Sequence, residues 1–545
     1  MVGARPDWRP CSKRGFSPVI KARPAAPLSL IEAAQPPQPL ADHAFESATT
    51  DALLVQGGDG RLVLDPASGV NKYGCAPRPD PALADFGSST ASVISSQGHA
   101  AADALRERLQ AEAPKSHSAV YARELERVRG ELTSLCGLDA SSEVEVVFAA
   151  SGSDLHLLVR ELVGGTPAAP LLCLGVEPQE TGSGVPVALE GRHFSDRAAL
   201  GESVIQGCAI GPGGGSYIAI ASRKADGRLR EVAVIEAELD ALCLHASKTG
   251  RRVLLTVADV SKTGLISPDL HTVLALRRRF PNTLEVLIDA CQFRLSDATL
   301  RAYLDNDLMV AVTGSKFLTG PIFCGALFVP PATAQRLRGR LLRPALRPYS
   351  ARAEWPKGWF AGKALSDVAN NGLLLRWEAA LAELRAFRAL GEDQVDAFTT
   401  RFAEAIQVRL AEDARFEPLA VRPLDRDAIG APEGWDRTPT IFPFLLREQY
   451  RTKNAPFLSV ATTDSVYRAL MVGGIEEAMR ARLGQPVSCG ERDGAPISAL
   501  RICNSARVIV EGVADPEGVI NRALAVLDQT AQIAGRVTLA GRIYS

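Results

Sequence analysis

The sequence predicts an α/β fold with a mostly parallel sheet, and two observations lead to this prediction. From about residue 100 onward, short apolar runs alternate with stretches of helical spacing. The runs are largely apolar throughout, as expected of strands that helices cover on both faces. With 545 residues, the chain is also long enough for a large core and more than one domain.

The expected elements follow one another in a regular order. A helical pattern with leucine and valine on one side covers residues 101–136. The expected strands come next, at residues 144–148, 171–174, 253–257, 284–288, 309–312 and 326–329. A long helical stretch is expected from about residue 371 to 410, and short strands and helices complete the chain.

The pattern divides the chain into three parts. Residues 1–45 are rich in Pro, Ala and Arg without an apolar period, and we expect a disordered tail there. Residues 46–345 are expected to form a large domain that includes an N-terminal segment. Residues 346–545 are expected to form a linking helix and a smaller C-terminal α/β domain.

Composition argues against several classes of protein. Lys and Arg number 61 and Asp and Glu 62, so the charge does not indicate nucleic-acid or polybasic membrane binding. No apolar run approaches the ~20 residues that a bilayer span needs. The 10 cysteines form no CxxC pair and no paired histidines occur, so neither a disulfide framework nor a metal site is expected. We therefore expect a soluble, cytoplasmic protein.

The residues after each strand are the place to look for chemistry, because ligands of open parallel sheets lie beyond the carboxyl ends of the strands. The run Ser151-Gly152-Ser153-Asp154 follows the strand at 144–148 and opens a helix. Free N–H groups at a helix start suit a phosphate. The same residues could form an ordinary N-cap.

Two charged residues follow later strands. Asp289 ends the strand at 284–288, where a carboxylate needs a cationic partner. Lys316 follows the strand at 309–312 among small residues, and a desolvated lysine becomes a nucleophile. The chain has only 11 lysines, so few others compete for a covalent role. Taken singly, a capping aspartate and a solvated lysine remain alternatives.

The combination of a phosphate cup, an acid and a lysine, each after a strand and in this order, is what pyridoxal 5'-phosphate (PLP) requires. A lysine holds the aldehyde as a Schiff base, an aspartate keeps the pyridine nitrogen protonated, and the cup holds the phosphate. Lys316, Asp289 and the turn at 151–154 supply these groups.

The sequence resembles the fold-type I PLP enzymes, in particular the class V aminotransferase and cysteine desulfurase group. Residues 151–154, 260–268, 289–292 and 314–321 carry the resemblance, which spans roughly residues 85–330 with a weaker match near Arg501. It implies a large PLP domain with a mostly parallel sheet and a smaller C-terminal domain.

The resemblance also implies roles for individual residues. Lys316 would form the Schiff base, Asp289 would pair with the pyridinium, and Gln292 would hydrogen-bond the ring hydroxyl. Ser261 would supply a further polar contact to the cofactor. The phosphate would be lined by Gly152, Ser153, Asp154, Thr313 and Ser315. Arg501 resembles the arginine that binds the substrate α-carboxylate, and a surface ion pair is its alternative.

The sequence departs from the desulfurase pattern at two places and offers one candidate for its cysteine. Residues 180–184 hold no aromatic ring to stack on the cofactor, and Ser315 stands where a second histidine is usual. Cys489, in the loop-like stretch 485–490, is the candidate for the sulfur-accepting cysteine. A small, partly buried hydrophobe is the alternative for this residue.

The resulting hypothesis is a homodimeric PLP-dependent transferase or lyase that acts on a small amino acid. It would proceed through an external aldimine and removal of the Cα proton by Lys316, as a cysteine desulfurase-like or C–S lyase-like enzyme. A class V aminotransferase and a non-catalytic scaffold of the same fold are the alternatives.

Overall fold

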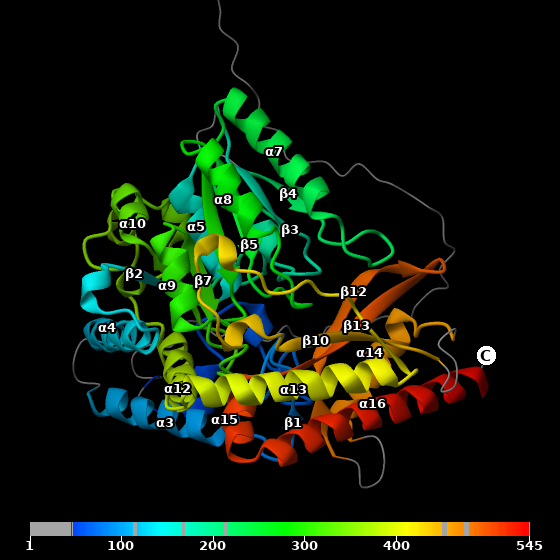
Figure 1. Cartoon of the computed structure of the whole chain (residues 1–545). Helices are drawn as coiled ribbons and strands as arrows, with labels where there is room; N and C mark the ends of the chain where they lie inside the picture. Colours follow the sequence, from blue (N-terminus) through cyan, green and yellow to red (C-terminus); the bar gives the residue numbers. More distant parts are fainter. Residues whose placement is uncertain are drawn as a thin grey trace, which may run out of the picture. The chain divides into compact units, whose positions relative to one another are not determined.

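In the computed structural model, the six predicted strands and one further strand that was not predicted, β4, form a seven-stranded sheet (Figure 1). The order of its strands is β2-β8-β7-β6-β5-β3-β4. Strand β8 runs antiparallel to both β2 and β7, whereas the other neighbours are parallel. The strands are β2 (Glu145–Ala149), β3 (Leu172–Val176), β4 (Ser216–Ile220), β5 (Val253–Ala258), β6 (Leu284–Ala290), β7 (Met309–Thr313) and β8 (Gly325–Val329). The predicted mostly parallel sheet is confirmed.

Both faces of this sheet are buried except at the edge strand β4, which explains why the other strands are largely apolar. Leu255 belongs to one hydrophobic cluster and its neighbour Leu254 to another, because successive side chains point to opposite faces. Helices supply the covering layers, and α5 packs on β2, β7 and β8. The helices of this part are α5 (Gly152–Val163), α6 (Val185–Leu189), α7 (Val232–Lys248), α8 (Leu270–Arg279), α9 (Asp297–Asp305), α10 (Pro331–Leu337) and α11 (Phe360–Lys363).

Two stretches expected to be single helices are each divided. The pattern at 101–136 forms α3 (Ser96–Ala111) and α4 (His117–Leu135), after the short helix α2 (Thr50–Leu54). The stretch at 371–410 forms α12 (Asn371–Arg388) and α13 (Glu392–Glu412). At the second break, Gly391 caps the start of a new helix, and its N–H donates to the side chain of Gln394. Hydrophobic spacing continues across such a break and does not reveal it.

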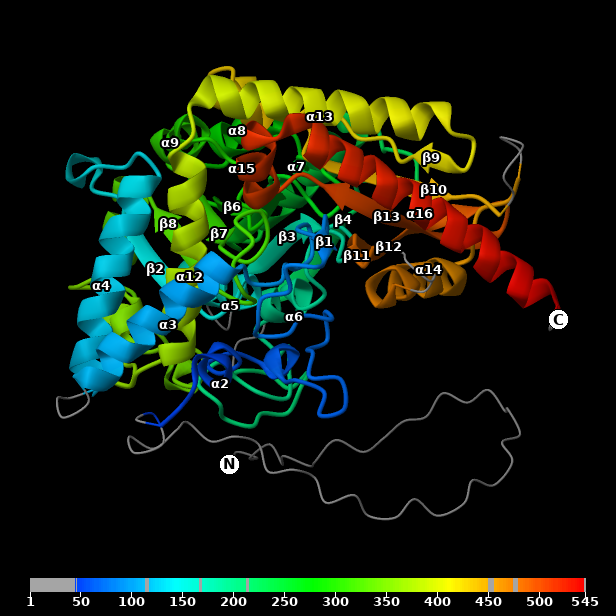
Figure 2. The ribbon, with the colours of Figure 1, turned by 90° about the horizontal axis from the view of Figure 1, so that it is seen from below.

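The C-terminal part contains a four-stranded antiparallel sheet in the order β12-β13-β10-β9. Its elements are β9 (Phe416–Pro418), β10 (Ile441–Leu446), α14 (Val460–Val472), β12 (Gly484–Arg492), β13 (Ala495–Cys503), α15 (Ala506–Ala514) and α16 (Pro516–Ile543). The short strands β1 (Ala84–Asp85) and β11 (Ala481–Arg482) pair in parallel and join the segment before α3 to this part (Figure 2).

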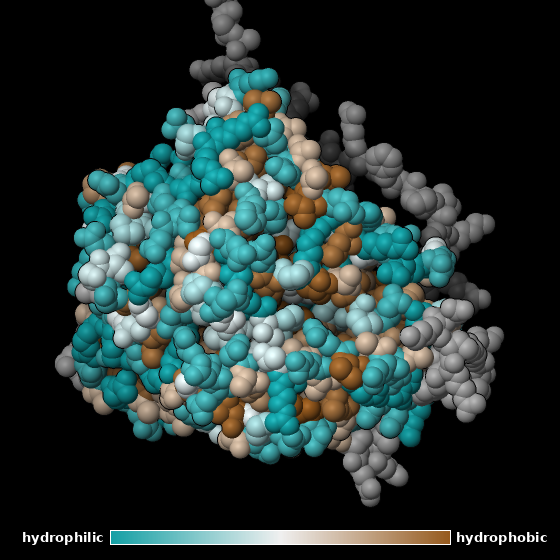
Figure 3. Space-filling view, viewed as in Figure 1, coloured by the Kyte–Doolittle hydropathy of each residue, from teal (hydrophilic) through white to brown (hydrophobic). Residues whose placement is uncertain are grey.

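The structure describes residues 45, 47–112, 117–165, 169–211, 215–448, 455–473 and 479–543. Apart from Phe45, the tail expected at 1–45 lies outside the described residues. Among the described helices, none combines the length and apolar character needed to cross a bilayer. On the face drawn in Figure 3, polar side chains cover most of the described surface and apolar ones form small scattered groups.

Candidate active site

The start of α5 touches the residues that end β6 and β7. A Cβ added to Gly152 would lie 2.9 Å from Cys291 Sγ and 3.6 Å from Thr313 Cγ2. Thr313 Oγ1 also donates to the carbonyl oxygen of Cys291 at 2.7 Å. The turn predicted to bind phosphate, the strand of Asp289 and the strand before Lys316 therefore meet at one edge of the sheet.

Asp289 is 9% exposed and faces His156 of α5. His156 Nε2 lies 3.4 Å from Asp289 Oδ2, and its Nδ1 lies 2.7 Å from the Gly152 carbonyl oxygen. A carbonyl oxygen only accepts hydrogen bonds, so Nδ1 must carry a proton. When Nε2 is protonated as well, the imidazolium is positively charged and attracts the Asp289 carboxylate. Burial alone would raise the pKa of Asp289, but His156 and Lys316 outweigh it and hold the pKa below its usual range.

Lys316 lies in the loop after β7 and is half-buried. Ser92 Oγ donates to its carbonyl oxygen at 3.4 Å, which ties the loop to the segment before α3. Within the described part of the chain, its ammonium has neither a hydrogen-bond acceptor nor a carboxylate in ion-pair distance. The amine is therefore available for chemistry near Asp289.

The first turn of α5 offers N–H groups that have no acceptor inside the helix. Ser151 is the N-cap, and its Oγ donates to Asp154 Oδ2 at 2.5 Å. The Asp154 carboxyl thus faces the cap, and burial followed by the charge of Asp59 raises its pKa to about 7. Ser315 Oγ lies 3.5 Å from Thr313 Oγ1 at the opposite side of the turn.

The structure adds a cation beside this turn that the sequence did not reveal. Arg61 Nη2 lies 3.3 Å from Ser151 Oγ and 3.5 Å from Ser153 Oγ. Asp59 pairs with the guanidinium at 2.5 Å and holds it in place. A guanidinium at a helix N-terminus strengthens an anion site. Its position depends on a contact across some 90 residues of sequence, which no local pattern encodes.

Gln292 lies in the same region, and its side-chain amide makes only part of its possible hydrogen bonds. Its Nε2 donates to the Ser89 carbonyl oxygen at 2.9 Å, while its buried Oε1 has no partner in the described structure. Ser89 belongs to a run of small residues at 87–92, which also contains Thr90 and Ser92 and forms one wall of the site. The sequence could have indicated this part of the site, because small polar residues line many ligand sites.

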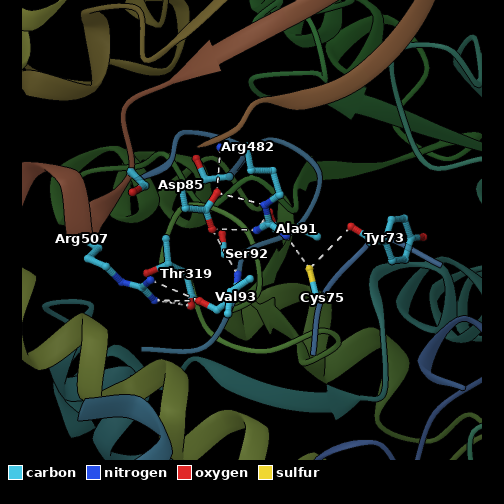
Figure 4. A network of polar contacts seen from close by, with 12 residues as sticks. Tyr73, Cys75, Asp85, Ala91, Ser92, Val93, Thr319, Arg482 and Arg507 are labelled. Carbon is cyan, nitrogen blue, oxygen red and sulfur yellow. Dashed lines mark hydrogen bonds and ion pairs between the residues drawn. The ribbon is translucent and has the colours of Figure 1, made fainter. Parts of the chain in front are cut away.

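A polar network braces this wall against the loop of Lys316 (Figure 4). Arg482 pairs with Asp85 at 2.7 Å and donates to the Ala91 carbonyl oxygen at 2.7 Å. Arg507 donates to the carbonyl oxygens of Val93 and Thr319 at 3.2 and 3.0 Å. Since Thr319 follows Lys316 in the same loop, the C-terminal arginines fix both sides of the site.

Ser261 lies in the loop after β5 and is held there by Glu180. Its Oγ donates to Glu180 Oε2 at 2.6 Å, and Thr263 Oγ1 donates to the same carboxylate. Arg223 Nε pairs with Glu180 at 3.1 Å. Glu180 thus organises the loop after β5.

Arg501 in β13 is 0% exposed, so the alternative of a surface ion pair is wrong. It donates to Thr90 Oγ1 at 3.0 Å, to the Lys262 carbonyl oxygen at 3.3 Å and to the Gln485 carbonyl oxygen. No carboxylate of the described residues pairs with it, and its Nε has no partner. A buried guanidinium without an anion is suited to bind one.

Cys489 does not lie in a loop, so that expectation is wrong. It belongs to β12, which pairs with β13, and its side chain is 7% exposed among Leu419, Leu445 and Ile497. Burial raises the pKa of its thiol to about 11, whereas a nucleophilic cysteine needs a low pKa. The geometry supports the small-hydrophobe alternative for this residue.

Comparison with known proteins rests on structure alone. No family model matches the chain, and no curated protein matches it in sequence. A mutant of C-DES with glycine covalently linked to its PLP cofactor is similar over 83% of this chain and 96% of its own, with 16% identity and a TM-score of 0.51. A NifS-like protein is similar over 82% of this chain and 99% of its own, with 10% identity and a TM-score of 0.50. The chain therefore has the fold predicted from its sequence, that of the fold-type I PLP enzymes.

Proposed function

We propose that this protein is a PLP-dependent enzyme that acts on a small amino acid. One arrangement carries the proposal: the half-buried Lys316, the His156–Asp289 pair and the start of α5 meet at one edge of the sheet. The similarity to C-DES, whose solved mutant carries PLP, supports the same conclusion.

The residues at this edge fit the functional groups of PLP. The first turn of α5 and Arg61 suit the phosphate, and Asp289 suits the pyridine nitrogen. The buried Gln292 Oε1 has no partner in the described structure and can accept a hydrogen bond from the ligand. Gly152 keeps the approach open, since a Cβ there would crowd Cys291.

PLP, when bound, supplies an aldehyde for an amine and a ring that withdraws electrons from the substrate Cα. The chain supplies the remaining groups. Asp289, whose pKa is lowered, would stay ionised and would accept a hydrogen bond from the protonated ring nitrogen. Lys316 holds the cofactor and moves the Cα proton of the substrate. Arg501 binds the α-carboxylate through its buried guanidinium.

For the reaction type we propose C–S bond cleavage by β-elimination. Lys316 removes the Cα proton, the Cβ–S bond of the substrate breaks, and sulfur leaves as a thiol. With cysteine and one water, the products are pyruvate, ammonia and hydrogen sulfide. This route needs no protein thiol, which agrees with the buried position of Cys489. We further propose that the protein is a cytoplasmic homodimer.

Product analysis tests the proposal. The PLP-loaded protein is incubated with L-cysteine, and sulfide, pyruvate and alanine are measured for wild type, Lys316→Ala and Cys489→Ser. We expect sulfide and pyruvate in equal amounts, lost in Lys316→Ala and kept in Cys489→Ser. Alanine formation that depends on Cys489 would instead indicate a desulfurase. Amino transfer to a keto acid would indicate an aminotransferase, and absence of PLP binding a scaffold.

A further inference from the structure

Lys262 is a second lysine at the candidate site, and contacts on both sides fix its backbone. It lies in the loop between β5 and α8, where its N–H donates to the Glu180 carbonyl oxygen at 2.8 Å. Its own carbonyl oxygen accepts from Arg501 Nη1 at 3.3 Å. The side chain is half-buried, and Nζ donates to the Pro178 carbonyl oxygen at 3.3 Å. Lys262 is thus held beside the arginine proposed to bind the substrate.

The charges around Lys262 leave a surplus of cations. The carboxylate of Glu180 is matched by Arg223, and that of Asp289 by His156. Neither Lys262 nor Arg501 pairs with a carboxylate in the described ranges. Burial, followed by the charges of Arg501 and Lys316, lowers the pKa of Lys262 to about 7. The ammonium form at this position is therefore stabilised by any anion that binds next to it.

A purely structural role would leave the ammonium poorly satisfied. An ammonium has three N–H donors, and Lys262 uses one of them on Pro178 at 3.3 Å, the only hydrogen bond of its Nζ in the described structure. The side chain is only half-buried, so its unused donors are open to water or to a ligand. A ligand with a negative charge would supply both the missing acceptors and the missing counter-charge.

A single α-carboxylate neutralises Arg501 but leaves Lys262 without an anion. We propose that Lys262 binds a second carboxylate, carried on the side chain of the substrate, so that the site selects amino acids with two acid groups. This inference rests on the proposed function, in which Arg501 holds the α-carboxylate. Together they specify a cysteine derivative whose sulfur substituent ends in a carboxylate.

Calorimetry with unreactive acids tests this inference without any turnover. The dicarboxylates succinate, glutarate and adipate are compared with the monocarboxylates butyrate, pentanoate and hexanoate on the PLP-supplemented protein. We expect the best dicarboxylate to bind wild type at least about tenfold more tightly than its monocarboxylate partner, as for a charge-assisted hydrogen bond.

Three variants assign the effect to Lys262. Lys262→Met removes the ammonium but keeps the chain length, and it should bring the two classes of acid to within about twofold. Lys262→Arg should keep most of the preference. Lys224→Met is the matched control, because Lys224 is half exposed and its Nζ lies 3.7 Å from Glu231. Equal binding of both classes to wild type, or an unchanged preference in Lys262→Met, would overturn the inference.

The same samples provide a separate test of the proposed function. The visible absorbance of PLP bound to Lys316 reports cofactor attachment before any acid is added. A protein without this absorbance contradicts the proposed function, while the calorimetric comparison still decides for or against a dicarboxylate site. A protein with the absorbance but no preference for dicarboxylates contradicts the inference alone.

Discussion

His156 Nε2 lies 3.4 Å from Asp289 Oδ2, and both side chains are buried at the candidate cofactor site. The Gly152 carbonyl oxygen, 2.7 Å from Nδ1, fixes the orientation of the imidazole. Burial lowers the pKa of His156, but Asp289 outweighs burial and raises it. The pair keeps Asp289 ionised, which is the form that a protonated pyridine ring requires.

Replacing His156 by Asn removes the positive charge but keeps a polar group at Gly152. We expect the pKa of Asp289 to rise, and exchange of the substrate Cα proton with solvent to slow by about tenfold or more. The readouts are the pH dependence of the cofactor absorbance and the rate of deuterium exchange at Cα. His99→Asn serves as control, since His99 pairs with Asp51 outside the site. An absorbance profile identical to that of wild type would show that His156 has no influence on Asp289.

Replacing Gly152 by Ala crowds the phosphate turn, because the new Cβ lies 2.9 Å from Cys291 Sγ. Overpacking of this kind weakens PLP binding by roughly tenfold or more. Fluorescence titration with PLP measures the effect, and adding Cys291→Ala should restore part of the affinity. Gly130→Ala in α4 is the control, because its Cβ meets open space. Unchanged PLP affinity in Gly152→Ala would place the phosphate elsewhere.

Replacing Arg426 by Met tests the structural support of the β5 loop. Arg426 Nη2 lies 2.5 Å from Asp259 Oδ1, and both side chains are 0% exposed. Leaving Asp259 buried without its partner lowers the free energy of unfolding by about 3–5 kcal/mol. Urea denaturation measures this loss, and the double variant Arg426→Met with Asp259→Asn should recover much of it. A single variant as stable as wild type would contradict the importance of this ion pair.

Dicarboxylate binding should depend on pH through Lys262. Its pKa is lowered to about 7, so the ammonium is present below pH 7 and is lost as the pH rises above it. Arg501, Lys316 and Glu180 are the charged groups that act on it, and a bound carboxylate adds a further negative charge. The affinity of wild type for dicarboxylates should therefore fall between pH 6 and 9, by roughly tenfold per unit at most. Lys262→Arg should flatten the profile, and a wild-type profile already flat would argue against Lys262.

The sheet was predictable because its signal is local. Each strand except β4 is a short apolar run buried on both faces, and turns with small residues follow β2 and β7. Once the strands are located, the sequence also locates the residues at or after their ends, which include Gly152, Asp289 and Lys316. By contrast, α12 and α13 divide at a helix boundary that hydrophobic spacing does not mark.

The rest of the site depends on contacts between distant parts of the chain. Arg61 and Ser89 reach the site across long stretches of sequence, and His156 alone looks like a core residue of an amphipathic helix. Cys489 looked like a loop residue because Pro486 and Gly490 flank it. Pairing with β13 nevertheless makes this stretch a strand, since neighbouring strands decide β-structure more than local propensity does.

Borohydride reduction shows directly whether Lys316 carries the cofactor, because it converts the imine between PLP and a lysine into a stable amine. The protein is incubated with PLP, reduced, digested and mapped by mass spectrometry, with Lys316→Ala as the matched control. We expect one phosphopyridoxyl group on Lys316 and none on the peptide of Lys262, with the label lost in the variant. A phosphopyridoxyl group on Lys262 or another lysine, or no label at all, would contradict this expectation.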